Sequence, residues 1–272
     1  MGKKRLSNGL FTAAMWAIAL LTIMPFVFMV VVSFRPAGLA YKSLFYASKP
    51  ILKNYAEVLG NKNFLNWYLN TIKTVIVTIV LRLAITIPAA YAFARLKFPG
   101  KRILYLILMA TMMIPSENTI ISKYVLFKAL GLLNTHWVII FPEMSQVFHL
   151  LLMAEFFEQI PMDYVDAARI DGARDLSIMG RIFVPLSGPC IATCIIFTFI
   201  FVWNDYVDPF LYISSIDKQL ITPALQFFQE RGGADIPVQL AGASLAIIPI
   251  IIVFLVTQKY FIAGVTSSGI KG

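Results

Sequence analysis

Long runs of apolar residues, separated by short polar segments, dominate the chain. An α-helix needs about 20 predominantly apolar residues to cross the hydrocarbon core of a bilayer. The pattern therefore predicts an all-α integral membrane protein, in one domain covering residues 1–272. Its six expected transmembrane helices are Leu10–Phe34, Tyr68–Ala94, Ile103–Ile121, His136–Phe157, Pro185–Asn204 and Gln239–Ile262.

The amino-acid composition supports a membrane location. Hydrophobic residues make up 59% of the 272 positions and charged residues 14%, against about 45–50% and about 25% in soluble domains. A soluble globule of this size could not bury the excess, because much of its surface must face water. Composition thus excludes a soluble enzyme, a disordered chain and a fibrous repeat.

The distribution of basic residues predicts the orientation of the spans, because cytoplasmic loops carry an excess of Lys and Arg. With both termini in the cytoplasm, the inner segments hold 12 such residues in 58 positions and the outer segments nine in 81. The clusters at Lys3–Arg5 and Arg95–Arg102 contribute most of the bias. We therefore expect both termini to be cytoplasmic, and we assign the net charge of +9 to orientation and docking, with no nucleic-acid partner.

Motifs for nucleotide hydrolysis and metal binding are missing. The two Gly-Lys pairs, Gly2-Lys3 and Gly100-Lys101, lack the other residues of a phosphate-binding P-loop. Cys190 and Cys194 lie in an apolar run, and the chain has only two His, so we expect no metal site. The sequence predicts a non-catalytic chain that binds no cofactor itself. Uphill transport would need an ion gradient or a partner ATPase.

The polar segment 158–184 predicts a compact helix–glycine–helix element on the cytoplasmic side. Met162–Ile170 forms about two turns, Gly172 supplies a left-handed stop, and Asp175 can cap a second short helix that ends before Pro185. Small side chains would let another surface approach closely, while charged ones would form its edges. These residues are Ala167, Ala168 and Ala173, and Asp166, Arg169, Asp171 and Arg174. An amphipathic linker lying on the membrane interface is the alternative.

Residues 166–189 carry the string Asp-Ala-Ala-x-x-Asp-Gly-Ala, followed at fixed spacing by Ile-x-x-Pro-Leu-x-x-Pro. It resembles the EAA loop of binding-protein-dependent ABC importer permeases, with Asp166 where that family commonly has a glutamate. Further strings resemble the carbohydrate-type, maltose-importer-like permeases and cover nearly the whole chain. They begin at Pro88, Met113, Gly131, Trp203 and Tyr260.

The resemblance implies a type I importer core in the bacterial or archaeal cytoplasmic (inner) membrane. This subunit would pair with a homologous second permease and carry a sugar or related polyhydroxylated solute. A cytoplasmic ABC ATPase dimer would hold ATP and Mg²⁺, and an extracytoplasmic solute-binding protein would deliver the solute. The tail Gly269–Gly272 corresponds to a family segment that can approach the ATPases. The implied ATPase-coupling residues are Asp166, Ala167, Ala168, Asp171, Gly172, Ala173 and Arg174.

Ionisable residues inside spans are costly and mark candidate functional positions. Arg82 lies thirteen residues before Arg95, hence about 20 Å from the inner face, and the same arithmetic puts Glu117 and Glu143 at about 21 Å. We therefore predict that Arg82 pairs with Glu143 or Glu117, as a structural pair or as part of the pathway. The candidate pathway or intramembrane polar residues are Arg82, Glu117, Asn118, Glu143, His149, Trp203 and Asn204.

Some of these residues have simpler interpretations. The segment Pro115–Asn118 should interrupt the third span, which is tolerable beside a cavity. Trp203 and Asn204 fit an aromatic belt as well as a wet vestibule, and His149 fits a buried core histidine. An ion-coupled secondary transporter using Arg82, Glu117 and Glu143 is the main rival function, although no two similar halves are visible. An integral-membrane enzyme is the second rival.

Overall fold

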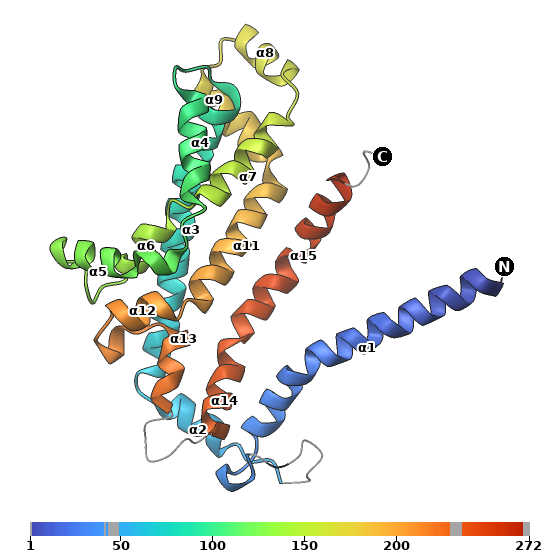
Figure 1. Cartoon of the computed structure of the whole chain (residues 1–272), viewed down its shortest axis with the longest axis vertical. Coiled ribbons are helices and arrows are strands. Elements are labelled where there is room, and N and C mark those ends of the chain that lie inside the picture. The colour runs from blue at the N-terminus through green and yellow to red at the C-terminus, as the bar shows by residue number, and fades with distance from the viewer. Residues whose placement is uncertain (1, 41, 43–48, 229–235, 269–272) are drawn as a thin grey trace. The chain divides into compact units, whose positions relative to one another are not determined.

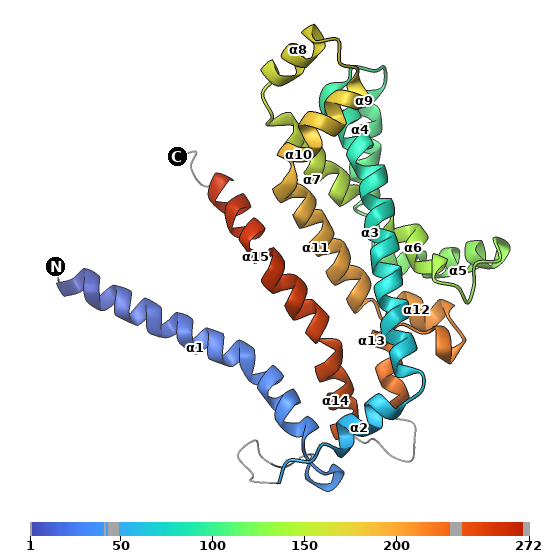
Figure 2. The same ribbon diagram turned by 180° about the vertical axis from the view of Figure 1, so that it is seen from behind.

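The computed structural model describes residues 2–40, 42, 49–228 and 236–268, with side chains described between 11 and 258 (Figures 1 and 2). Every regular element in these ranges is helical. The chain forms two compact units. Unit 1 comprises Met1–Leu65 and Ala224–Ile248, and unit 2 comprises Asn66–Pro223 and Pro249–Gly272. Because each unit is built from two separate stretches, neither corresponds to a sequential domain, and the one-domain assignment stays a prediction.

Unit 1 gathers elements from both ends of the chain. They are α1 (Gly2–Ser33), η1 (Ala37–Leu39), α2 (Lys53–Gly60), η5 (Leu225–Phe228) and α14 (Ile236–Ala246). The side-chain amide of Asn54 donates to the carbonyl oxygens of Ser33 (2.7 Å) and Arg35 (2.8 Å). It thereby satisfies carbonyls at the end of α1 that have no partner within the helix. At Gly242 a Cβ would lie 2.9 Å from Leu225 Cδ2, so a glycine lets α14 approach η5.

Unit 2 contains the candidate functional residues. It begins with α3 (Phe64–Arg95, from Asn66 on), and α15 (Ile248–Ser268) belongs to it from Pro249 on. In Figures 1 and 2, α8 and α9 lie at one end of this unit and α5 and α12 toward the other, with α3 and α11 running between them. The intervening elements are α4 (Lys101–Thr111), η2 (Ser116–Thr119), α5 (Ile120–Ala129), α6 (Trp137–Glu143), α7 (Val147–Glu158), α8 (Asp163–Ile170), α9 (Asp175–Ile178), the π-helical η3 (Met179–Phe183), α10 (Val184–Leu186), α11 (Gly188–Asn204), α12 (Val207–Tyr212), η4 (Ile216–Lys218) and α13 (Ile221–Ala224).

Four stretches of the described chain are long and apolar enough to cross a membrane: Phe11–Ser33, Phe64–Arg95, Trp137–Glu158 and Ile236–Gln258. Two further pairs of helices qualify only when taken together. Lys101–Thr111 and Ser116–Ala129 meet at 93°, and Asp175–Leu186 and Gly188–Asn204 meet at 79°. The described residues thus hold four continuous candidate spans, or six when each bent pair counts as one. The count of six spans stays a prediction.

The expected interruption of the third span, Ile103–Ile121, at Pro115–Asn118 is confirmed. Helix α4 ends at Thr111 and η2 begins at Ser116, with Pro115 between them in an extended conformation. Pro115 has no N–H to donate, and its ring disfavours a helical conformation at the residue before it, so this position favours a break. The chain therefore changes direction here rather than crossing in one piece.

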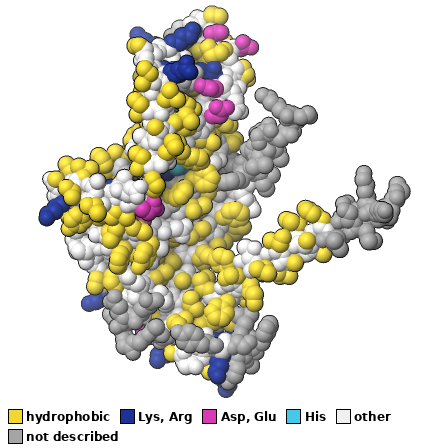
Figure 3. Space-filling view, in the orientation of Figure 1, with side chains coloured by type: hydrophobic (Ala, Val, Ile, Leu, Met, Phe, Trp, Pro, Cys, Tyr) yellow, Lys and Arg dark blue, Asp and Glu magenta, His cyan; other side chains and the backbone are white. Residues whose placement is uncertain are grey.

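A buried cluster at the α8 end of unit 2 holds the helices together. Phe183 is 0% exposed, and its ring makes edge contacts with Tyr91 (centroids 5.1 Å apart) and Phe157 (5.2 Å). These rings come from η3, α3 and α7, so the cluster joins three elements around the segment that carries α8. On the face shown in Figure 3, hydrophobic side chains cover most of unit 2, and charged ones gather at the end with α8 and α9.

Candidate functional site

The α8 segment ends in a hydrogen-bonded glycine motif. Gly172 has φ +77°, and its N–H donates to the carbonyl oxygen of Arg169 (3.0 Å). The N–H of Ala173 donates to the carbonyl oxygen of Ala168 (2.9 Å). This pair of bonds is the Schellman arrangement, in which a left-handed glycine satisfies the last carbonyls of a helix and reverses the chain. The predicted short helix and its glycine stop are therefore confirmed.

Asp175 does not cap the second helix, contrary to the sequence-based prediction. The N-cap position belongs to Arg174, and no side chain makes a capping hydrogen bond there. Instead, Asp175 Oδ1 accepts hydrogen bonds from the Tyr91 hydroxyl (3.2 Å) and from Arg169 Nη2 (3.3 Å). The helical path also does not end before Pro185, because η3 and α10 continue it to Leu186. The Asp175 carboxylate therefore binds side chains of α3 and α8, and not the helix end where the local sequence had placed it.

Arg95, the last residue of α3, holds the chain where it enters α8. Its Nη2 donates to the carbonyl oxygens of Phe157 (2.5 Å) and Ile160, and its Nη1 contacts Met162 Sδ (2.9 Å). The guanidinium also lies over the Phe183 ring, 5.1 Å from the centroid. A cation is favourable at the carbonyl end of a helix, here that of α7. Together with the Tyr91–Asp175 bond, this contact ties α3 to the chain on both sides of α8.

The predicted coupling residues lie together on the surface around α8. Asp166, Ala167, Asp171, Gly172 and Arg174 are exposed, and Ala168 and Ala173 are half-buried. A cavity of about 580 Å³ is lined by Ala168, Asp171, Gly172, Ala173 and Arg174, among others. Two large apolar side chains beside it are strongly exposed, Ile170 at 87% and Leu176 at 77%. A cavity lined by small side chains, with exposed apolar side chains beside it, is typical of a protein-docking surface.

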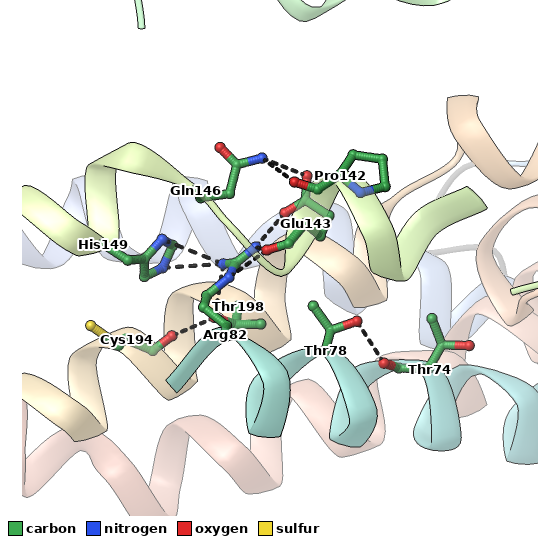
Figure 4. A network of polar contacts seen from close by, with 9 residues as sticks. All are labelled: Thr74, Thr78, Arg82, Pro142, Glu143, Gln146, His149, Cys194 and Thr198. Atoms are coloured by element: carbon green, nitrogen blue, oxygen red, sulfur yellow. Dashed lines mark hydrogen bonds and ion pairs between the residues drawn. The ribbon is translucent and has the colours of Figure 1, made fainter. Parts of the chain in front are cut away.

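A second cluster surrounds Arg82, which is 1% exposed (Figure 4). Its Nη2 forms an ion pair with Glu143 Oε2 (2.6 Å), and both Nη2 and Nε donate to the backbone carbonyl of the same residue. Its Nη1 donates to Thr198 Oγ1 (2.8 Å) and approaches His149 Nε2 (3.3 Å). Because α6 ends at Glu143, that carbonyl lies at a helix end, where the last carbonyls have no partner within the helix.

The predicted pairing of Arg82 is confirmed with Glu143 and not with Glu117. Glu117 is exposed and accepts a hydrogen bond from the hydroxyl of its neighbour Ser116 (3.2 Å). Asn118 beside it is also exposed. His149 is 2% exposed and belongs to the Arg82 cluster. The structure therefore brings three of the four ionisable candidates together and leaves Glu117 apart.

Trp203 and Asn204, at the end of α11, have different surroundings. Trp203 is 1% exposed, stacks on Phe199 (centroids 5.1 Å apart) and meets Tyr68 edge to face (5.7 Å). Asn204 is exposed, and its amide donates to the carbonyl oxygen of Ile200 (2.8 Å). Trp203 thus packs inside unit 2. A pathway role for either residue stays a prediction.

Sequence analysis missed Gln146 as part of the Arg82 cluster. Its Nε2 donates to Glu143 Oε1 (3.1 Å) and to the carbonyl oxygen of Pro142 (3.4 Å). It lies at the break between α6 and α7, where it precedes the first residue of α7. The signal was available, because an amide three residues after a carboxylate and four after a proline, within an apolar run, is unusual.

A small acidic cluster follows α11. Lys123 forms an ion pair with Asp208 (2.9 Å), and the Asp208 N–H donates to Asp205 Oδ1 (3.3 Å). Burial, and then the nearby negative charge of Asp208, raise the pKa of Asp205 from 3.8 to about 7. Burial likewise raises the pKa of the Tyr212 hydroxyl to about 12. Asp205 therefore changes charge near neutral pH.

Residues 83–267 match the family described as binding-protein-dependent transport system inner membrane component. The chain belongs to this family. The matched range contains α8, the Gly172 turn, Arg95 and Glu143. This permease therefore has the all-helical fold of a multi-pass inner-membrane transport component.

Curated relatives match the permease along almost its entire length. It is 31% identical to a putative ABC transporter permease protein, ORF2, of a Caldicellulosiruptor species, covering 95% of this chain and 94% of the relative. It is 29% identical to the arabinooligosaccharides transport system permease protein AraQ of Halalkalibacterium halodurans (94% and 93%). It is 30% identical to the maltose/maltodextrin transport system permease protein MalG of Vibrio parahaemolyticus (95% and 94%).

Solved structures have the same fold. A chain of a bacterial ABC transporter involved in the import of the acidic polysaccharide alginate superposes with a TM-score of 0.84 at 26% identity, covering 95% of this permease and 98% of that chain. A chain from bacterial alginate ABC transporter in complex with alginate pentasaccharide-bound periplasmic protein gives a TM-score of 0.64 at 12% identity, covering 94% of each chain. The second likeness concerns the fold alone.

Proposed function

We propose that this chain is the permease subunit of an ATP-driven importer that carries a sugar or related polyhydroxylated solute. The observation that carries the proposal is the family match over residues 83–267. The relatives named for arabinooligosaccharides and for maltose and maltodextrin, each matched over more than 90% of its length, support the solute class. The chain would form half of the translocation pathway.

The segment 161–185 would couple the permease to a separate ATPase that binds ATP and Mg²⁺. Support comes from the hollow around Gly172 and from the exposed Ile170 and Leu176 beside it. The contacts of Arg95 and Tyr91 would pass a movement of α8 directly into α3, because they hold the chain on both sides of α8. Two discrete, hydrogen-bonded contacts transmit displacement better than a free loop would.

The remaining partners follow from the same proposal. A homologous second permease would complete the membrane pair, and an extracytoplasmic protein would deliver the solute. The periplasmic protein named for one solved relative supports such a delivery partner. Both termini and α8 would face the cytoplasm, with lipid around the exposed apolar helices. The tail Gly269–Gly272, expected near the ATPases, lies outside the described residues.

The ion-coupled alternative has less support. A coupling carboxylate must be free to bind and release its ion, but Glu143 is held by Arg82 at 2.6 Å. Glu117 is exposed at the α4–η2 bend and does not join that pair. Family membership also favours an importer that takes its energy from a partner chain.

The proposal is tested by expressing the chain with the genes that neighbour its own, purifying the complex and measuring sugar uptake into liposomes. ATP-dependent uptake that needs the binding protein is expected. Uptake by this chain alone, driven by an ion gradient without ATP, would overturn the proposal. A bulky substitution on the exposed surface of α8, Ala167→Tyr, should release the ATPase while the two permeases stay together. The matched control, Ala19→Tyr on exposed α1, should leave the complex intact.

A further inference from the structure

A cavity of about 410 Å³ opens beside the Arg82–Glu143 pair in unit 2. This volume is typical of small-ligand sites, which combine apolar walls with a few polar groups. Its polar walls include Ser116, Glu143 and Gln146. Its aromatic walls are Phe148, Phe197 and Phe201. Phe148 and Phe201 are 42% and 61% exposed, so their faces are open to an occupant.

Two interrupted helices meet at this cavity. Ser116 is the first residue after the α4–η2 bend, and Glu143 and Gln146 flank the break between α6 and α7. Irregular backbone at membrane depth is tolerated where it lines a cavity. Transporters commonly build their solute sites from such discontinuous helices. The interrupted backbone thus supports a solute site at this cavity, as its lining side chains do.

The guanidinium of Arg82 lies in the cavity wall and is already paired with Glu143. Arg82 is 1% exposed, and it donates hydrogen bonds from Nε and Nη2 to Glu143 and from Nη1 to Thr198. Glu143, in contrast, is 27% exposed, and Glu117 lies next to Ser116 with its carboxylate exposed. A solute entering the cavity therefore meets the exposed oxygens of Glu143, whose charge Arg82 neutralises, and no accessible guanidinium. A carboxylate on the solute would lose its hydration without gaining a free cation in the cavity wall, which is unfavourable.

The remaining polar groups of the cavity are acceptors that can bind the hydroxyl groups of a solute. Glu143 offers acceptor oxygens, and no hydrogen bond among the described residues engages Gln146 Oε1. Figure 4 shows this amide oxygen pointing away from the ion pair. Sugar hydroxyls donate to such acceptors, and the C–H face of a sugar ring packs on exposed phenylalanine rings. Sites that hydrogen-bond hydroxyl groups discriminate strongly, because analogues leave polar groups unpaired.

We propose that this cavity contacts the transported solute directly and takes a neutral sugar unit in preference to an acidic one. The inference rests on the proposed function and narrows its solute class. It also separates this permease from the solved relative involved in the import of acidic alginate, despite their TM-score of 0.84. A shared fold does not fix the charge of the solute.

The first test measures uptake by the complete complex in liposomes, with neutral arabino- and malto-oligosaccharides and acidic oligogalacturonate as probes. Gln146→Leu and Phe201→Ala should each lower uptake of the neutral sugar at least tenfold. The matched control is Phe141→Ala, which removes an exposed ring on α6 outside the cavity wall and should leave uptake unchanged. Wild-type complex should import no oligogalacturonate.

The second test measures the charge of the cavity directly. Cys190 and Cys194 are buried, so a Gln146→Cys variant places one accessible thiol at this site within unit 2. An uncharged methanethiosulfonate should modify it at least tenfold faster than an anionic one, and the imported neutral sugar should slow both reactions. This readout needs no transport, so it decides the proposal even if Gln146→Leu fails to assemble.

The outcomes separate the two proposals. If the wild-type complex imports no sugar with ATP, the proposed function fails. If it imports sugar but Gln146→Leu and Phe201→Ala match the control, the cavity inference fails and the function stands. Faster anionic modification of Gln146→Cys, or protection by oligogalacturonate, would overturn the preference for a neutral unit.

Discussion

Arg82 contacts Glu143 in two ways, through a 2.6 Å ion pair with the carboxylate and through donation to the backbone carbonyl of the same residue. One guanidinium therefore neutralises a charge and also closes the end of α6. The carbonyl part of this arrangement survives any substitution of the Glu143 side chain. The carboxylate part does not, so the two parts can be separated experimentally.

Removing one partner of this pair should destabilise the protein more than removing both. Glu143→Leu leaves the buried Arg82 without its counter-charge, which typically costs about 3–5 kcal/mol. The double variant Arg82→Leu/Glu143→Leu should recover much of that loss. Thermal unfolding midpoints of the wild type, the two single variants and the double variant, purified in detergent, measure this double-mutant cycle. Glu117→Leu, at an exposed position, serves as the control and should change the midpoint little.

Shortening the reach of Arg95 should weaken coupling. A lysine in Arg95→Lys keeps the charge but cannot bind the carbonyls of Phe157 and Ile160 with one planar fork. We expect at least a tenfold loss of the ATPase stimulation caused by solute-loaded binding protein, with assembly retained. Arg102→Lys, at an exposed position on α4, should leave stimulation unchanged. Equal effects of the two substitutions would contradict the coupling role.

The Gly172 turn should tolerate asparagine better than alanine or valine. At φ +77° no atom lies within 4 Å of an added Cβ, so the penalty comes from backbone conformation alone. That penalty is about 1–2 kcal/mol for ordinary residues and smaller for asparagine. ATPase stimulation should follow the order Gly, Asn, Ala, Val. Gly180→Ala, which also has open space but no positive φ, should behave like wild type. An order that follows side-chain size alone would contradict this explanation.

Asp205 should make stability fall as pH rises from about 4 to 7. Its pKa is raised in the folded state from 3.8 to about 7, so across this window the folded protein binds more protons than the unfolded one. The advantage is lost across this window, with a slope of at most about 1.4 kcal/mol per pH unit, and stability levels off above the folded pKa, where both states are ionised. Asp205→Asn should flatten the profile of thermal midpoints between pH 4 and 7. Asp217→Asn, at an exposed carboxylate, should leave it unchanged.

Local sequence information was sufficient for some features. The α8 helix and its Gly172 stop depend on residues within one turn of each other, and both formed as predicted. The pairing of Arg82 with a carboxylate followed from equal depth in the membrane, which needs only residue counting. The interruption at Pro115 followed from the chemistry of proline.

Other features depended on partners far along the chain. Asp175 is a residue type that commonly caps helices, but its carboxylate accepts a hydrogen bond from Tyr91, 84 residues earlier. The choice between Glu143 and Glu117 was set by the 93° bend, whose direction no periodicity encodes. Arg95 was noticed as a basic residue, but its acceptors are backbone carbonyls that every sequence supplies. Such contacts leave no compositional signature.

The main-chain acceptors of Arg95 have an evolutionary consequence. A contact that ends on the carbonyl oxygens of Phe157 and Ile160 makes no demand on the chemistry of the side chains at those positions. If α8 is the ATPase-coupling element proposed above, its exposed surface is free to diverge, residue by residue, to suit a particular ATPase while its anchor to α3 persists. Under this arrangement, exchange of α8 between related permeases would be expected to change which ATPase is recruited, without rebuilding the membrane helices that it drives.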